Sequence, residues 1–145
     1  MQKAIIKYIN QYRAAQGSTQ LTYLPGMTKV AKYRSKQLTT NFAHDVDDIR
    51  EAYAYYKYGE LVDMTIHGLP ESKNYYEAQN NEAIGYGYYS GTAYEIGQQV
   101  AQGFRNSSGH WAYVSSSEYS YTGVGVTKSG SRWYVCVIVG RVNYG

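Results

Sequence analysis

Apolar residues recur at helical spacing in several stretches of the chain. In residues 2–16 one face carries Ile5, Ile6 and Ile9, and Gly17 is a stop signal for the helix. Residues 27–41 repeat this spacing, with one arginine among the apolar residues of the face (Met27, Val30, Ala31, Arg34 and Leu38). Further helices are predicted over 45–58, where aspartates suit the positive end of the helix dipole, and over 92–107, where Thr92 suits the N-cap.

The C-terminal part of the chain has the pattern of a β-hairpin. Residues 121–128 and 133–140 are predicted strands, joined by a turn at Ser129-Gly130-Ser131. The second strand is apolar on both faces from Val135 to Val139, which predicts a central strand covered by helices on both sides. Residues 83–89 form either a short strand or a loop, and 59–81 are mostly loop, with a short strand as an alternative near 61–66. The chain is therefore interpreted as one α+β domain over residues 1–145.

Charge is distributed unevenly along the chain. Within the formal net charge of +3, residues 1–44 carry seven bases and no acid, whereas 45–77 carry eight acids and three bases. The bases recur at helical spacing rather than in one run, so they are interpreted as a solvated helix face. No recognised nucleic-acid motif accompanies them, and a nucleic-acid partner is not expected.

Composition narrows the class of protein further. Tyrosine supplies 19 residues against 2 Phe and 2 Trp, which favours a tyrosine-rich extracellular surface over a dedicated aromatic platform. Cys136 is the single cysteine and lies in a strand pattern, so a buried apolar role is favoured over that of a nucleophile. No apolar run approaches the length of a membrane span. The first residues already read as an amphipathic helix, so an export signal is expected only as a segment removed from a parent chain.

Polar residues at the junctions between predicted elements are candidates for a site. His44 follows the second helix, Glu82 precedes the 83–89 segment, and His110 follows the helical pattern that closes with Phe104. Such junctions can meet at one end of a layered domain, so we expect the three side chains to converge in one solvent-open cleft. Two neutral imidazoles and a carboxylate suit Zn²⁺ with water in an open fourth position. The alternative is that His44 and His110 point apart and bond to local backbone, and His67 is interpreted as an exposed loop residue.

Short motifs in a fixed order carry a family resemblance. The first motif is Asn10-Gln11-Tyr12-Arg13, with Gly17, Leu21 and Tyr23 after it. The next motifs along the chain are Phe42-Ala43-His44, Asn81-Glu82-Ala83-Ile84 and Phe104-x-x-Ser-x-Gly-His110. The series ends with Tyr121-Thr122-Gly123-Val124-Gly125 and the strand over 133–140. In order and spacing it resembles the CAP superfamily, also called the SCP-like or cysteine-rich secretory protein, antigen 5 and pathogenesis-related 1 domain.

Departures from the family pattern restrict what can be carried over. Asn81 and Ala83 replace the Gly and Asn of the Gly-Glu-Asn motif, Phe104 replaces a Trp, and Ser107 stands where many eukaryotic members have a second Glu. Of the family's two His and two Glu cleft residues, only His44, Glu82 and His110 have counterparts. Because it has no cysteine pairs, the chain resembles the bacterial members of the family. The long segment between His44 and Glu82, residues 45–81, suggests an insertion beside the cleft.

The resemblance implies a three-layer α-β-α sandwich with a small antiparallel sheet between helices. It also implies secretion or surface display, and an extracellular partner that is a lipid, a cell-wall component or a protein. Separately, Asn10 and Arg13 are predicted to be structural, because an arginine at a partly apolar helix position needs partners for its five donors. The resemblance leaves the oligomeric state and the reaction open. A binding module is the favoured function; the alternatives are a metal-dependent or His/Glu acid–base hydrolase and a largely structural surface domain.

Overall fold

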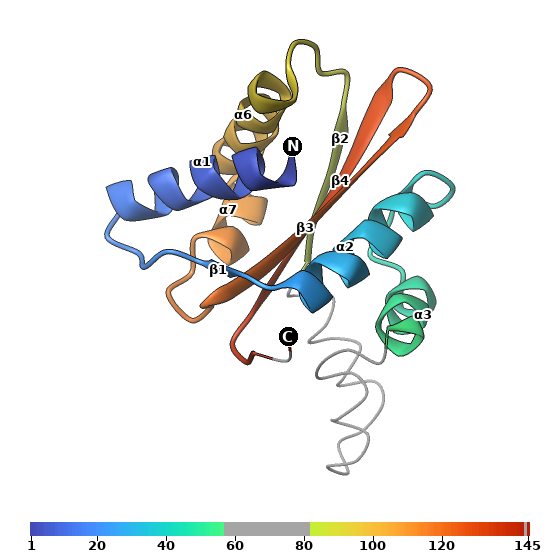
Figure 1. Cartoon of the computed structure of the whole chain (residues 1–145), viewed down its shortest axis with the longest axis horizontal. Helices are drawn as coiled ribbons and strands as arrows, with labels where there is room; N and C mark the ends of the chain where they lie inside the picture. Colours follow the sequence, from blue (N-terminus) through green and yellow to red (C-terminus); the bar gives the residue numbers. More distant parts are fainter. Residues whose placement is uncertain (57–81, 144) are drawn as a thin grey trace.

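The computed structural model describes residues 1–56, 82–143 and 145. In chain order its elements are α1 (Gln2–Ala15), β1 (Thr22–Tyr23), α2 (Pro25–Leu38), α3 (Val46–Tyr55), β2 (Glu82–Gly87), α6 (Ala93–Asn106), α7 (Ser108–Val114), β3 (Tyr121–Ser129) and β4 (Arg132–Gly140) (Figure 1). The α+β class is confirmed. The alternative strand near 61–66 and His67 lie outside the described residues.

Side chains at the N-caps set where two of the helices begin. The Asp45 carboxylate accepts hydrogen bonds from the backbone N–H groups of Asp47 and Asp48, both at 3.0 Å, and so starts α3. Thr92 caps α6 as predicted, and it forms a capping box with Glu95. The polar sequence at these two positions therefore fixes both helix starts locally.

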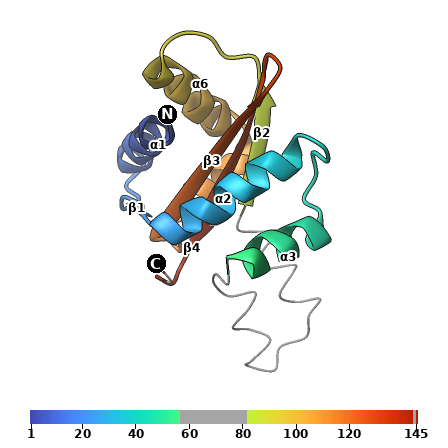
Figure 2. The same cartoon turned by 45° about the vertical axis from the view of Figure 1, so that its right-hand side comes forward.

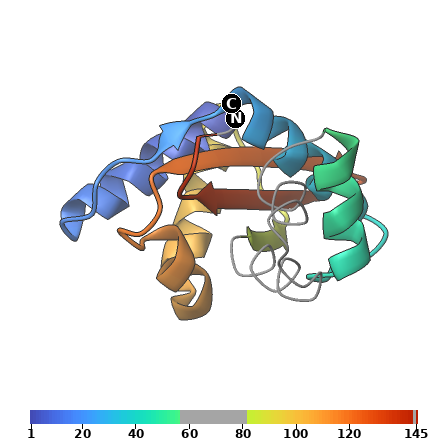
Figure 3. The same cartoon turned by 90° about the horizontal axis from the view of Figure 1, so that it is seen from below.

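The strands form one four-stranded sheet in the order β1-β3-β4-β2. The predicted hairpin is confirmed, since β3 and β4 pair antiparallel and Gly130 in their turn has a φ of +61° (Figure 3). β4 is central, because β2 pairs antiparallel with its other side. The predicted small antiparallel sheet is confirmed for β2, β3 and β4, and the two-residue β1 adds a parallel pairing with β3. Two residues are too few to show a strand period, so β1 could not be predicted from the pattern of apolar residues.

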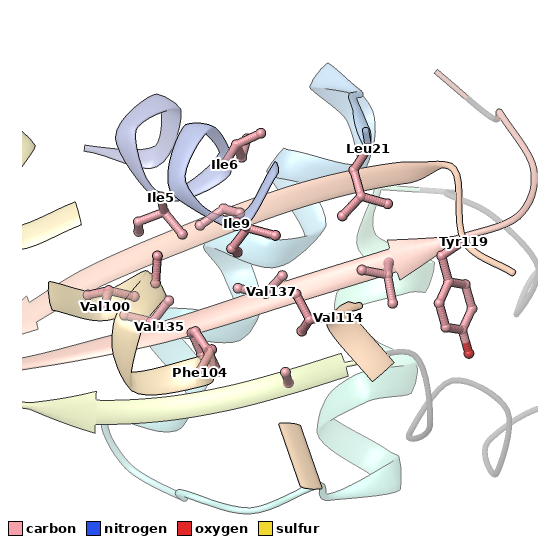
Figure 4. Close-up of a cluster of buried hydrophobic side chains, with 14 of the residues drawn as sticks. Ile5, Ile6, Ile9, Leu21, Val100, Phe104, Val114, Tyr119, Val135 and Val137 are labelled. Carbon is pink, nitrogen blue, oxygen red and sulfur yellow. The ribbon is translucent and has the colours of Figure 1, made fainter. Parts of the chain in front are cut away.

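Helices cover both faces of this sheet, which confirms the three-layer sandwich. Figure 2 shows α1 and α6 on one side of the strands and α2 and α3 on the other. Alternate residues of β4 supply both hydrophobic clusters, with Val135 and Val137 on one face and Cys136 and Ile138 on the other. Figure 4 shows the first cluster, whose members from helices include Ile5, Ile6, Ile9, Val100, Phe104 and Val114.

Helix α2 lies very close to β3 because two β3 residues that face it have no side chain. A Cβ atom on Gly123 would overlap the backbone of Met27, and one on Gly125 would overlap the backbone of Ala31. Glycine inside a strand often marks such a close backbone approach. The contact fixes the height of α2 above the sheet, and α2 carries a residue of the site described below.

The predicted structural roles of Asn10 and Arg13 are confirmed. Asn10 exchanges two hydrogen bonds with the backbone of Leu21, at 3.1 and 2.8 Å. Arg13 donates to the carbonyl oxygens of Thr19, Val114, Ser116 and Tyr119 at 2.7 to 3.2 Å. These bonds join α1 to the segment before β1, to the end of α7 and to the segment that follows α7.

Two sequence predictions are corrected by the helices. The N-terminal bases do not all lie on solvated faces, because Arg13 and Arg34 are each 0% exposed. The segment after α6 does not lead directly into strands, because it forms a further short helix, α7, which contains His110. α7 has seven residues and buries only Val114, so it has no apolar stripe that a periodicity argument could detect.

Candidate functional site

A buried ion pair between α2 and β2 lies at the base of the site. Glu82 is the first residue of β2 and is 3% exposed. The Arg34 guanidinium donates from Nε to Oε1 and from Nη2 to Oε2 of this carboxylate, both at 2.7 Å. Both carboxylate oxygens are therefore held by one planar fork, which is the strongest geometry for such a pair.

The pair keeps both partners ionised. Burial raises the pKa of Glu82, but the hydrogen bonds from Arg34 and then His44 outweigh it, so the net pKa lies below the ordinary value. Burial likewise lowers the pKa of Arg34, and the hydrogen bond and charge of Glu82 outweigh that effect and leave the pKa raised. A carboxylate held in this way accepts hydrogen bonds and does not donate them.

His44 is oriented by this carboxylate. Its Nδ1 lies 2.9 Å from Oε2 of Glu82, and its side chain is 43% exposed. Because an ionised carboxylate only accepts, Nδ1 carries a hydrogen that is directed at Glu82. Arg34 also donates to the carbonyl oxygen of Ala43 at 3.1 Å, so the residue before His44 is held by the same guanidinium.

His110 faces the same pocket from α7. The two imidazoles line it together with Phe42, Ala43, Ile84, Gly85 and Tyr86, and its volume is about 440 Å³. The His110 ring packs edge-on against Phe104, with ring centroids 5.3 Å apart. Burial, and then the charge of His44, lower the pKa of His110, which favours the neutral imidazole.

A smaller pocket adjoins the first. It has a volume of about 200 Å³ and shares Gly85, Tyr86 and His110 with it, while Tyr89 and Phe104 supply much of its apolar wall. We call the two pockets together the cleft. Exposed aromatic rings stand at its rim, since Phe42 is 42% exposed and packs edge-on against Tyr86 at 4.8 Å.

The three residues predicted from the sequence occupy different depths. His44 and His110 line the cleft, whereas Glu82 lies beneath it and orients His44. The sequence interpretation missed Arg34, which it assigned to a solvated face. The signal that could have found it was its position on the apolar face of α2, because a buried arginine needs a partner for its donors.

The described residues do not fit a zinc ion held by all three predicted side chains. Residues 1–56 and 82–143 contain no group of three His, Cys, Asp or Glu side chains arranged to hold a metal ion. Both oxygens of Glu82 are engaged by Arg34, and one of them also by His44. A zinc site formed by His44, Glu82 and His110 thus stays a prediction that the geometry of Glu82 does not favour.

Cys136 lies next to the same ion pair but away from the cleft. It is 0% exposed, and its thiol donates to Oε1 of Glu82 at 3.6 Å. Burial and the neighbouring Glu82 charge raise the pKa of this thiol well above its ordinary value. The predicted burial is confirmed, and the thiol is in its unreactive, protonated form.

Solved structures show the same fold. An extracellular protein containing an SCP domain from Bacillus anthracis str. Ames superposes with a TM-score of 0.60 at 16% identity, covering 94% of this chain and 39% of that one. A cysteine-rich secretory protein from Staphylococcus aureus subsp. aureus Mu50 gives 0.57 at 13% identity, covering 96% and 38%. The CAP domain of enterococcal PrgA gives 0.63 at 18% identity, covering 94% and 58%. This chain thus spans less than two thirds of the length of each of these neighbours.

The sequence itself provides the family assignment. No curated protein matches it significantly. Among the residues that the structure describes, no helix has the length and apolarity needed to cross a membrane. The cysteine-rich secretory protein (CAP) family matches residues 6–139, from α1 to the end of β4. A match over nearly the whole chain, together with the three-layer fold, shows that this protein belongs to the CAP family.

Proposed function

We propose that this domain is an extracellular binding module whose cleft holds a ligand or a protein partner. The observation that carries the proposal is the pocket shared by His44 and His110, which lie on opposite layers of the sandwich. Its volume of about 440 Å³ lies within the roughly 300–1,000 Å³ of ligand sites. Imidazoles supply hydrogen bonds, and the rings of Phe42 and Tyr86 supply apolar contact area.

The ion pair beneath the cleft supports a binding role. Arg34 and Glu82 fix the tautomer and the orientation of His44 before any ligand arrives. Pre-organised polar groups lose less conformational entropy on binding, so they increase affinity without new contacts. We infer that Glu82 acts through His44 and does not itself touch the ligand, since it is 3% exposed.

The test is a ligand screen read out by the backbone amide signals of the isotope-labelled chain. Short peptides, cell-wall glycan fragments and fatty acids represent the candidate ligand classes. A ligand of the cleft should shift the signals of residues 84–86 and of His44 and His110, and binding should weaken in His44→Ala and His110→Ala. Tyr23→Ala on β1, at the opposite edge of the sheet, is the matched control. Ligands that shift only signals outside the cleft would refute this function.

Secretion or surface display of a bacterial protein is part of the proposal. It is supported by the description of the Bacillus anthracis neighbour as extracellular. Fractionation of the source cells, with antibodies against this domain, should place the protein in the medium or on the surface. Its recovery solely from the cytoplasmic fraction would contradict this.

Acid–base hydrolysis is a second candidate, and the position of the His110 side chain in the wall of the cleft favours it. The lowered pKa of His110 keeps its imidazole neutral near pH 7, as a general base requires. The buried Glu82 is less suited to proton exchange with a substrate, because Arg34 holds both of its oxygens. A screen of peptide and ester substrates, with and without added Zn²⁺, tests this candidate. Turnover that disappears in His110→Phe would support it, and unchanged turnover would assign the activity to a contaminant.

A further inference from the structure

The cleft lies along one edge of the sheet that the described strands form. β2 is the last strand in the order β1-β3-β4-β2, and among the described residues only β4 pairs with it. An unpaired edge presents backbone N–H and C=O groups that can pair with another extended chain. Whether those groups face the cleft follows from the hydrogen bonds of the sheet.

The hydrogen bonds to β1 give the orientation of β3. The N–H of Thr22 donates to the carbonyl of Ser120 at 2.8 Å, and the N–H of Leu24 donates to the carbonyl of Thr122 at 3.0 Å. In a strand, the N–H and C=O of one residue point to the same side, and successive residues alternate. The even-numbered residues of β3 therefore direct their backbone groups towards β1, and the odd-numbered residues towards β4.

The strand register shows how the backbone N–H and C=O groups alternate in β4 and β2. Gly125 is opposite Cys136, so the backbone of Cys136 faces β3 and that of Val135 faces β2. Val135 is opposite Gly85, which uses its own N–H and C=O to pair with β4. The neighbouring residues, Ile84 and Tyr86, must then direct their backbone groups away from β4, towards the open edge.

These outward groups lie at the cleft. Ile84, Gly85 and Tyr86 line the larger pocket between the imidazoles of His44 and His110. The cleft therefore has a strand edge along its floor and one imidazole on each side. An extended peptide is the ligand whose own donors and acceptors repeat at the spacing of such an edge.

The smaller pocket provides room for a side chain of such a peptide. Residues directly opposite in a pair of strands project to the same face of the sheet, and a Cβ on Gly85 would lie 3.5 Å from the Phe104 ring. A peptide residue opposite Gly85 would therefore project into the pocket lined by Tyr89 and Phe104. Its volume of about 200 Å³ is below the roughly 300–1,000 Å³ of small-molecule sites, and its wall suits one apolar side chain.

We propose that the cleft binds an extended peptide segment by adding it as a strand to the outer edge of β2, the edge that no described strand occupies. The peptide places an apolar side chain over Gly85, towards Phe104, and its neighbouring side chains beside Phe42 and His44. None of the residues that line the two pockets is Asp, Glu, Lys or Arg, so uncharged segments are favoured. This inference rests on the proposed binding function and specifies its partner.

A phage-displayed library of random dodecapeptides, selected on the immobilised chain, supplies the probe. Selected peptides are then synthesised with single N-methyl groups along their length. Strand addition predicts that methylation at alternate positions lowers affinity by about ten-fold or more, the effect of losing one or two backbone hydrogen bonds, and that the positions between tolerate it. In the bound chain, hydrogen exchange should slow at the amides of Ile84 and Tyr86 and stay unchanged at that of Gly85.

A pair of variants separates backbone from side-chain effects. Tyr86→Pro removes an outward N–H that β4 does not use, a position where an edge strand tolerates proline. Tyr86→Ala removes the ring and keeps the N–H. Tyr86→Pro should lose at least about ten-fold more affinity than Tyr86→Ala. Should Tyr86→Pro not fold, the methylation pattern on the unmodified chain decides.

Different failures have different meanings. Peptides that shift His44 and His110 but show no alternation on methylation and no slowed exchange would overturn strand addition and leave the binding module intact. Peptides that bind without affecting either imidazole would overturn both proposals. A library that yields no binder would overturn strand addition, and the screen of glycan fragments and fatty acids would still decide whether the cleft binds a ligand.

Discussion

Arg34 and Glu82 come from segments far apart in the sequence and form a two-point ion pair, with both N–O distances at 2.7 Å. The side chains are 0% and 2% exposed, so neither charge can be solvated when its partner is removed. The pair also reaches the surface through His44, whose Nδ1 lies 2.9 Å from the carboxylate. A change in this pair should therefore alter both stability and the cleft.

Glu82→Leu and Arg34→Met should each lower the free energy of unfolding by about 3–5 kcal/mol, because each leaves a buried charge without its partner. The double variant Arg34→Met, Glu82→Leu should recover most of that loss, since it removes both charges together. Urea unfolding of the wild type, the two single variants and the double variant gives a double-mutant cycle. Additive losses in the double variant would show that the pair does not interact as the geometry requires.

Acidification should destabilise the chain in two ranges of pH. The pKa of His110 is lowered from 6.5, so the unfolded chain takes up this proton first, and the free energy of unfolding decreases as the pH falls below 6.5. The pKa of Glu82 is lowered from 4.5, so its contribution is fully present above pH 4.5 and is lost as the pH falls through the lower folded value.

Unfolding curves measured across this pH range in the wild type and in His110→Phe check the assignment. The variant should lose the first decrease and keep the second. Identical profiles for the two proteins would assign the first decrease to another group.

Arg13→Met should lower the free energy of unfolding by about 1–3 kcal/mol, because it removes the donors to four carbonyl oxygens. Arg13→Lys should recover little of the loss, since an ammonium group cannot reproduce the planar fork of the guanidinium. Thermal and urea unfolding measure both. Full recovery in the lysine variant would indicate that only the charge matters.

Gly125→Ala should destabilise the chain by roughly 1–3 kcal/mol or more, because the added methyl group would overlap the backbone of Ala31. Gly103→Ala is the matched control. It lies inside α6, and its added Cβ meets no atom within 4 Å, so it should stabilise the helix by roughly 0.5–1 kcal/mol. Equal effects of the two substitutions in urea unfolding would show that α2 can move away from the sheet freely.

Cys136 should react with thiol reagents only when the chain opens. Its thiol is 0% exposed, and burial raises its pKa. Labelling should be slow in buffer and become fast in urea above the unfolding midpoint, as followed by mass spectrometry. Fast labelling of the native chain would place this residue at the surface.

The sequence predicted the elements that carry a strong period and missed those that do not. The hairpin and the central position of β4 followed from its run of apolar residues on both faces. β1 and α7 were missed because two and seven residues are too few for a pattern to emerge. Their existence depends on tertiary contacts, such as the hydrogen bond from Thr22 to Ser120.

The sequence identified three residues of the candidate site but not how deeply each side chain is buried. His44, Glu82 and His110 could be named because each follows or precedes an element and stands in a family motif. That Glu82 lies beneath His44 depends on Arg34, whose partner is 48 residues away in the sequence. Pattern arguments within one helix cannot identify a partner on a distant strand, so Arg34 was assigned to a solvated face.

The cleft also lies where the two hydrophobic clusters of the sandwich meet. His44 follows α2, which belongs to one cluster, and His110 lies in α7, which contributes Val114 to the other. A ligand that contacts both imidazoles would act as a cross-link between the two helical layers. Its binding energy would then oppose their separation, so the protein should unfold in a more concerted transition when the cleft is occupied.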